Sequence, residues 1–388
     1  MTMRLVHAED GWWCLAAGKV AHLPTEAVEA GELTTEARNA LHPHGFFEPA
    51  TRPYAVTVLT ATSCNLGCSY CFQNVGGSAA NPFAPQRIAR SLLNKETIRE
   101  AAAFVQLRMH ELSFDDVSLL LFGGEPLLNP QGCLGILRAL QPLGLTHAEM
   151  ISNTVLLRPR LARDLYDAGL RRIQVTFDGG REQHDQIRVD HRGGVTYDRI
   201  LQNVQDAGDA TELDWHFRVN ISHHTLAGVS ALIDDLAALN LPQSASVHLA
   251  LIDDIGIGYE NKISCDASLA KQFIGLVDHA FDAGLTVPVT GNSLKDCPFC
   301  GEFAGGTGAV INADGTLFSC WETAGRTDWA VGDIRNGYLP NDQIKHRWVA
   351  CDYAAASHGR ADEVRAFHDA IDAHILGRTY RPHSVVAG

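Results

Sequence analysis

The sequence has 388 residues, of which 46% are hydrophobic, which suits one large α/β domain of roughly 200–250 residues with smaller additions. Asp and Glu number 45 against 31 Lys and Arg, giving a net charge of −14. Such a surface disfavours phosphate backbones and anionic lipid, so we expect neither nucleic-acid nor membrane partners. No apolar run approaches the roughly 18 residues of a membrane span. The first residues become acidic too soon for a signal peptide, which predicts a cytoplasmic protein.

Residues 1–53 differ in pattern from the rest of the chain. Two strand-like stretches, Trp12–Ala17 and Lys19–Leu23, flank Gly18 and predict a short hairpin. Ala37–Leu41 predicts a helical turn. We expect this N-terminal extension to be too short for an independent core.

From Tyr54 onward, strand-like and helical patterns alternate. The apolar, strand-like runs are Tyr54–Ala61, Val117–Phe122, Ala148–Ile151, Ile173–Phe177, Phe217–Ile221 and Val247–Ile252. The helical patterns between and after them are Glu96–Leu112, Gly132–Leu140, Leu161–Ala168, Tyr197–Asp206, Leu226–Leu239 and Ser268–Phe281. Six strand–helix units predict a parallel α/β sheet over residues 54–290, curled into a partial (β/α)6 barrel of the TIM type. The loops after the strand C-termini would form its active face.

After Thr290 the alternation stops and the chain becomes rich in Gly and Cys. A turn signal at Asn312–Gly315 separates the apolar stretches Ala309–Ile311 and Thr316–Phe318, which predicts a hairpin. We expect residues 291–388 to form a small second domain that ends in a helix.

Three cysteines follow the first predicted strand at close spacing: Cys64, Cys68 and Cys71. In a reducing compartment, cysteines serve as metal ligands or reactive thiols rather than disulfides. Three thiolates can bind three irons of a cubane cluster and leave the fourth iron open to a ligand. A structural zinc site is the alternative, although it normally closes with a fourth Cys or His nearby. The three cysteines alone leave both interpretations open.

A second motif, Gly123-Gly124-Glu125-Pro126, follows the second predicted strand on the same face. Glycines let a ligand approach the backbone closely, and a carboxylate can meet a cation. Taken alone, the motif is an ordinary turn. Two such motifs at successive strand ends favour the cluster interpretation.

These motifs resemble the radical S-adenosylmethionine (SAM) superfamily, over roughly residues 54–335. The resemblance implies that Cys64, Cys68 and Cys71 hold a [4Fe-4S] cluster and that the Gly-Gly-Glu motif binds the SAM amino group. Members carry an aromatic residue where Tyr70 stands. At Ser152-Asn153-Thr154 many members have Thr-Asn-Gly-Thr, so this chain lacks the glycine.

A later pair of motifs narrows the resemblance. Thr176-Phe177-Asp178-Gly179 and His184-Asp185-Gln186-Ile187-Arg188 are similar to the S-x-D-G and H-D-x-x-R pattern of peptide-modifying members. By this resemblance Arg188 meets the SAM carboxylate, whereas by itself it would be interpreted as a surface ion pair. The cofactor-binding residues implied are Tyr70, Gly123, Gly124, Glu125, Ser152, Asn153, Thr176 and Arg188.

The C-terminal region holds a second group of cysteines: Cys297, Cys300, Cys320 and Cys351. The Gly-x4-Cys spacing that ends at Cys320 resembles the start of a SPASM domain. Only Cys351 follows, which resembles the shortened twitch form with one auxiliary [4Fe-4S] cluster. Zinc held by four thiolates is the competing interpretation.

The resemblance implies an enzyme that cleaves SAM to a 5′-deoxyadenosyl radical and abstracts hydrogen from a ribosomally made peptide. The product would be a crosslink or an epimerised residue, residues 1–53 would be a candidate leader-peptide element, and flavodoxin or ferredoxin would supply electrons. The alternatives are a twitch-type dehydrogenase of a small molecule, a sulfatase-type maturase and a non-catalytic zinc- or SAM-binding scaffold. Sulfatase-type maturases carry Asp where this chain has Trp321.

Overall fold

The computed structural model describes residues 3–16, 18–48, 52–68, 70–71, 73, 88–241, 245–252, 263–289, 302–349 and 361–380. Within these ranges, the main sheet has ten strands in the order β11-β10-β9-β8-β7-β6-β12-β13-β14-β15. Neighbouring strands from β6 to β11 pair in parallel. None of the described helices is long and apolar enough to span a lipid bilayer.

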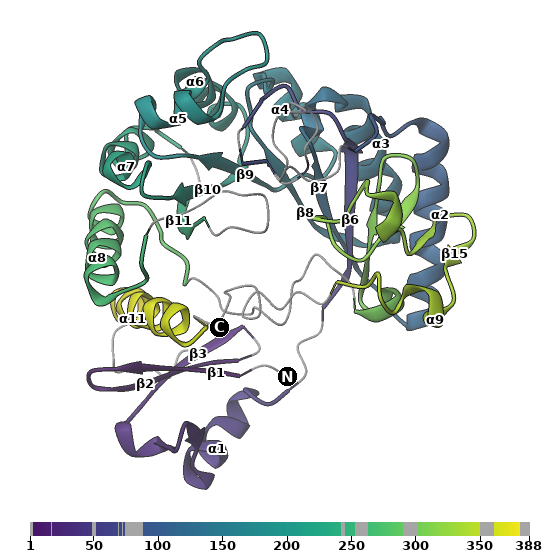
Figure 1. Ribbon diagram of the computed structural model, residues 1–388. Helices are drawn as coiled ribbons and strands as arrows, with labels where there is room; N and C mark the ends of the chain where they lie inside the picture. The colour runs from purple at the N-terminus through teal and green to yellow at the C-terminus, as the bar shows by residue number, and fades with distance from the viewer. Residues whose placement is uncertain are drawn as a thin grey trace.

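The predicted strand–helix alternation is confirmed. The strands are β6 (Tyr54–Ala61), β7 (Val117–Gly123), β8 (Leu145–Ser152), β9 (Arg172–Phe177), β10 (Asp214–Ile221) and β11 (Ala245–Leu251). The helices are α2 (Lys95–Leu112), α3 (Pro130–Leu140), α4 (Pro159–Asp167), α5 (Arg181–Ile187), α6 (Tyr197–Gly208), α7 (Val229–Ala237) and α8 (Ala267–Asp282). The helices lie outside the curved sheet, as a partial barrel requires (Figure 1). The short helix α5 was not predicted.

The two faces of the sheet differ in character. Phe217 and Val219 of β10 are buried together with Val229 and Leu232 of α7, on the helix-covered face. Because successive side chains of a strand point to opposite faces, the intervening residues of β10 lie on the concave face. At β6 and β7 that concave face is apolar, with a buried cluster that includes Leu59, Leu120, Phe122, Val310 and Phe318.

The predicted C-terminal hairpin is confirmed, and it extends the barrel sheet. β12 (Gly308–Ile311) pairs in parallel with β6 and antiparallel with β13 (Thr316–Phe318). A side chain at Gly308 would collide with the backbone carbonyl of Ala55, so this close strand pairing needs glycine. Short strands β14 (Gly332–Asp333) and β15 (Gly337–Tyr338) continue the sheet. The predicted domain boundary at residue 290 lies outside the described residues.

The N-terminal segment forms a small unit with its own core. β1 (Arg4–Ala8), β2 (Gly11–Ala16) and β3 (Lys19–Leu23) make an antiparallel sheet, followed by β4 (Val28–Glu29), β5 (Glu32–Leu33) and α1 (Thr35–Leu41). The predicted hairpin and helical turn are confirmed. The expectation that this segment has no independent core is wrong, because Cys14, Leu33, Leu41 and Phe46 belong to a buried cluster separate from that of the barrel. Strand β1 and helix α1 contribute apolar side chains to this core, which a lone hairpin would not have.

The C-terminal helix α11 (Ala361–Thr379) joins this unit to the barrel (Figure 1). Arg4 of β1 forms ion pairs of 2.6 Å with Asp369 and with the fully buried Asp372 of α11. On the barrel side, His374 of α11 contacts Asp278 of α8 at 2.7 Å. Removal of one partner of a buried ion pair costs about 3–5 kcal/mol. Residues 3–48 therefore cannot be deleted without exposing a charged face of α11.

Candidate cofactor-binding site

The three cysteines of the CxxxCxxC motif lie in the loop after β6. All three are half-buried, and Cys68 and Cys71 both act electrostatically on Cys64, which makes the thiols near neighbours. The N–H of Leu66 donates a hydrogen bond of 3.4 Å to the Sγ of Cys64. A backbone hydrogen bond of 2.8 Å, from the N–H of Gly67 to the carbonyl of Val189, ties the loop to the segment after α5.

The chemistry of this loop fits an iron–sulfur cluster. Burial is the main factor that raises the pKa of the Cys64 thiol, and it raises that of Cys68 to about 11. Within the described ranges, no group of three or more His, Cys, Asp or Glu is arranged to hold a metal ion. The thiols are thus neighbours that must lose protons and converge when metal binds. Soft thiolates that accept backbone N–H bonds in a partly dry loop are typical of Fe–S ligation.

The Gly-Gly-Glu loop packs directly on the segment that leads to Cys64. The N–H of Gly124 donates to the carbonyl of Ala61, and that of Glu125 donates to Ser63, both at 2.9 Å. A side chain at Gly123 would collide with Ala61, and one at Gly124 with the backbone of Ser63. The glycines therefore bring the ends of β6 and β7 together, in addition to any contact with a ligand.

Glu125 is fully buried and joins the ends of β7 and β8. Its carboxylate accepts hydrogen bonds from the N–H of Leu127 (2.9 Å), the hydroxyl of Ser152 (2.7 Å) and the N–H of Asn153 (2.8 Å). Burial raises the pKa of Glu125, and the N–H donors of Asn153 and Leu127 oppose this shift. The predicted residues Glu125, Ser152 and Asn153 thus form one assembly.

Thr154 explains how the chain manages without the glycine that many members have at this turn. Its φ of 55° lies in the left-handed region, which costs an L-residue about 1–2 kcal/mol. The Thr154 N–H donates to the Ser152 hydroxyl at 2.9 Å, and its own hydroxyl donates to the Asn153 carbonyl at 2.8 Å. These two bonds hold Ser152 toward Glu125, so the turn keeps its shape although the sequence differs.

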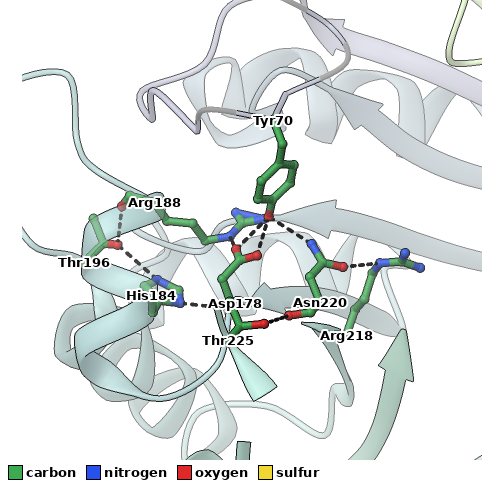
Figure 2. Close-up of polar contacts among 8 residues, drawn as sticks. All are labelled: Tyr70, Asp178, His184, Arg188, Thr196, Arg218, Asn220 and Thr225. Carbon is green, nitrogen blue, oxygen red and sulfur yellow. Dashed lines mark hydrogen bonds and ion pairs between the residues drawn. The ribbon is translucent and has the colours of Figure 1, made fainter. Parts of the chain in front are cut away.

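A buried ion pair lies opposite the cysteine loop, at the end of β9 (Figure 2). The Arg188 Nε donates a hydrogen bond of 2.7 Å to Asp178, which has no exposed side-chain surface. The Tyr70 hydroxyl lies 2.7 and 2.6 Å from the two Asp178 oxygens and accepts a bond of 2.9 Å from the Asn220 amide. Arg188 is only 12% exposed, so it is not a surface ion pair.

His184 holds the backbone of Arg188 in place through a directed chain of hydrogen bonds (Figure 2). The Asp178 N–H donates to His184 Nδ1 at 3.4 Å, which leaves the proton of a neutral ring on Nε2. Nε2 lies 3.2 Å from the Thr196 hydroxyl, which donates to the Arg188 carbonyl at 2.8 Å. Burial and then the charge of Arg188 lower the pKa of His184 to about 2, so the ring is neutral.

The ion pair and the cysteine loop form one electrostatic unit. Both Arg188 and Asp178 act on the Cys68 thiol, with opposite signs. Thr176, near the end of β9 and two residues before Asp178, makes no hydrogen bond through its hydroxyl to another described residue. The arrangement offers thiolates, a guanidinium and a buried carboxylate around one end of the sheet.

Comparison with known proteins identifies the family. The family model of the radical SAM superfamily matches residues 58–236. A GTP 3′,8-cyclase of Peptoclostridium acidaminophilum is 30% identical over 73% of this chain and 86% of that protein. The chain belongs to the radical SAM superfamily. A GTP 3′,8-cyclase of Synechococcus sp. (strain CC9605) is 26% identical over 71% of this chain and 83% of its own length.

Solved structures show the same fold at low sequence identity. Native anSMEcpe with bound AdoMet has a TM-score of 0.59 at 12% identity and covers 84% of this radical SAM chain and 99% of its own. Streptococcus suis SuiB bound to its precursor peptide SuiA has a TM-score of 0.51 at 13% identity, over 83% of this chain and 70% of that one. Radical SAM proteins bind SAM and a [4Fe-4S] cluster.

The structure brings most of the predicted site residues together, and it adds two. Asp178 belongs to a motif that the sequence displays, but its part in the site as the partner of Arg188 was not predicted. Asn220 lies at the C-terminal end of β10, where the strand-end rule for barrels could have indicated it. Cys320 is buried after β13. The other predicted auxiliary ligands, Cys297, Cys300 and Cys351, lie outside the described residues.

Alkylation of the iron-free protein checks the buried state of Cys68. Only the thiolate reacts, and burial raises the pKa of Cys68 to about 11. Its rate of reaction with iodoacetamide should therefore rise about tenfold per pH unit from pH 8 towards 11, while an ordinary cysteine levels off near its pKa of about 8.5. Mass spectrometry of the modified peptide gives the rate, with a synthetic peptide of the same loop as control. A plateau below pH 9 would contradict the burial.

Proposed function

We propose that this radical SAM enzyme modifies a ribosomally made peptide by abstracting a hydrogen atom from it. The observation that carries the proposal is the buried Asp178–Arg188 ion pair, which is held in place by His184. His184 and Arg188 are the first and last residues of the H-D-x-x-R pattern of peptide-modifying members, and the structure gives both a position at the site. The solved structure of anSMEcpe with bound AdoMet and the Cp18Cys peptide supports it through the fold. So does SuiB with its precursor peptide.

The residues have separate tasks in this proposal. Cys64, Cys68 and Cys71 hold the cluster, which with SAM supplies a 5′-deoxyadenosyl radical. Arg188 binds the SAM carboxylate in the planar, two-bond geometry that a guanidinium favours. Glu125 accepts a hydrogen bond from the SAM amino group. Its carboxylate is already held in place by three other donors. Gly123, Gly124, Ser152, Asn153, Thr176 and Tyr70 complete the binding wall.

The curated relatives support a second candidate, a GTP 3′,8-cyclase. Identity of 30% over 86% of such a protein favours this activity. In three further GTP 3′,8-cyclases the match covers only 40–59% of their length. A small-molecule dehydrogenase or sulfatase-type maturase remains an alternative within the same chemistry.

SAM cleavage by the anaerobically reconstituted enzyme tests the chemistry and the substrate together. The reduced wild type should form 5′-deoxyadenosine, and the Cys64→Ala, Cys68→Ala, Cys71→Ala triple variant should form none, because it has lost the cluster thiolates. A precursor peptide encoded beside the gene should stimulate cleavage and change mass, whereas GTP should do neither. Cys133→Ala, at a buried cysteine outside the motif, is the matched control.

The opposite results are equally informative. Undiminished 5′-deoxyadenosine in the triple variant would contradict the assignment of the cluster, and conversion of GTP would replace the peptide by the second candidate. The triple variant should keep about four irons if Cys297, Cys300, Cys320 and Cys351 hold an auxiliary [4Fe-4S] cluster, as we propose. One zinc per chain would favour a structural site instead.

Arg188→Gln separates binding from folding. The loss of one charge-assisted contact in a dry site, about 1.5–3 kcal/mol, should raise the Kd for SAM roughly ten- to a hundredfold at unchanged iron content. It also leaves Asp178 buried without its cation, which lowers the free energy of unfolding. Adding Asp178→Asn should restore stability but not SAM affinity. Equilibrium dialysis and urea unfolding measure the two quantities.

Arg335→Gln is the control for this pair of variants, because Arg335 is 64% exposed and pairs with Glu100 at the surface. It should change neither SAM affinity nor stability by more than about 1 kcal/mol. Wild-type SAM affinity in Arg188→Gln would remove Arg188 from the binding wall.

We also propose that the N-terminal sheet docks the leader part of the peptide. β3 is an outer strand of a three-stranded sheet, and such an edge accepts an added strand. With peptide bound, the amides of β3 should exchange with deuterium more slowly, while those of α2, on the outside of the barrel (Figure 1), should not change. Hydrogen-exchange mass spectrometry locates the protection. Protection confined to the barrel would place leader recognition elsewhere.

A further inference from the structure

The concave wall of the barrel carries a polar patch at β10 and β11 whose residues have no role in binding SAM or the cluster. In the parallel pairing of these strands, His216 lies opposite Ser246 and Arg218 lies opposite His248. Phe217, between the two β10 residues, is buried in the core beneath the helices. The patch therefore faces the inside of the barrel, where a substrate must lie to meet SAM.

Two imidazoles at this patch, one on β11 and one on the neighbouring α11, have ring nitrogens without a hydrogen-bond partner among the described residues. No described residue forms a hydrogen bond with the ring of His248, which is half-buried. The ring of His216, 5.8 Å away, is held by the Ser246 hydroxyl at 2.8 Å. From α11, His368 also acts on His248, and its Nδ1 is buried with no partner. A buried polar atom left without a partner costs about 1–3 kcal/mol, so His368 Nδ1 indicates a polar ligand beside His248.

The charge around His248 indicates which ligand fits. The described groups that act on His248 are Arg218 and His216 of β10 and His368 of α11, and no carboxylate is among them. Burial and then Arg218 lower the pKa of His248 to about 3, and those of His216 and His368 are lowered as well, so the rings are neutral. No set of three of these groups is arranged for a metal ion within the described ranges.

The patch is connected to the proposed SAM site. Arg218 Nε donates a hydrogen bond of 2.9 Å to Asn220, whose amide donates one of the same length to the Tyr70 hydroxyl (Figure 2). Tyr70 in turn donates a hydrogen bond to Asp178, the partner of Arg188. A group bound at His248 and Arg218 therefore lies beside the reacting centre rather than at the rim of the barrel.

We propose that Arg218 and His248 bind an anionic group of the substrate, a carboxylate or a phosphate. Arg218 supplies a charge-assisted hydrogen bond, and the N–H of neutral His248 supplies a second donor. The inference rests on the proposed function in assigning this anion to the molecule that is modified. A carboxylate belongs to an acidic side chain or the C-terminus of a peptide, and a phosphate belongs to a nucleotide.

Carbethoxylation of the SAM-bound holoenzyme by diethyl pyrocarbonate, which attacks neutral accessible imidazoles, tests the site. At constant ionic strength, acetate or inorganic phosphate at twice its Kd should slow the labelling of His248 about threefold. Labelling of His110, an exposed residue of α2, should not change. Arg218→Gln should abolish the protection without preventing the labelling. Mass spectrometry of the His248 peptide gives each rate.

Each outcome of the labelling experiment either supports or overturns the proposed anion site. Protection by acetate assigns a carboxylate, and protection by phosphate alone assigns a phosphate. Equal protection by neutral acetamide, or protection by none of the probes, overturns the inference. It is also overturned if His248 stays unlabelled while His110 reacts, because the ring would then be closed to ligands. Labelling does not require SAM cleavage, so this site and the proposed function can fail separately.

Discussion

The buried carboxylate of Asp178 is the constraint on which the site depends. An ionised carboxylate without exposed surface must be paired, since an unpaired buried charge costs several kcal/mol. Its partners come from separate segments: Tyr70 from the cysteine loop and Arg188 from the end of α5. Pairing one charge therefore fixes the cysteine loop against β9, and through Asn220 it reaches β10. The pairing that this buried charge requires therefore also brings the residues of the site together.

Glu125 has the corresponding role on the other side of the cysteine loop. Its three donors come from its own turn and from the end of β8, so it closes the gap between β7 and β8. Gly123 and Gly124 let this assembly touch the backbone before Cys64. Two buried carboxylates thus frame the cluster loop. Asp178 pairs with an arginine, whereas the hydrogen-bond donors of Glu125 are neutral groups. Burial therefore raises the pKa of Glu125, and these donors and the charge of Arg188 only partly oppose the shift.

The sequence allowed the barrel to be predicted because parallel strands buried on both faces read as continuous apolar runs. α5 was missed because Arg181–Ile187 carries no apolar stripe. It forms because His184 and Arg188 are held by tertiary hydrogen bonds, which periodicity does not register. The N-terminal core was missed for a similar reason: its cover comes from β1 and α1, each too short to be convincing alone. Of the site, the motif residues were predictable, whereas Asn220 depends on a contact with Tyr70 across 150 positions.

Surface charge and interior charge must be judged separately in this enzyme. The net charge of −14 describes an exterior whose field is screened beyond a Debye length of about 8–10 Å in physiological salt. The described groups that act on His248 are an arginine and neutral imidazoles, and they lie inside the barrel. Composition therefore argues against extended polyanions that must lie along the surface. It says little about a single anionic group carried into the barrel on a substrate, because that group exchanges water for Arg218 only after it has passed the acidic exterior.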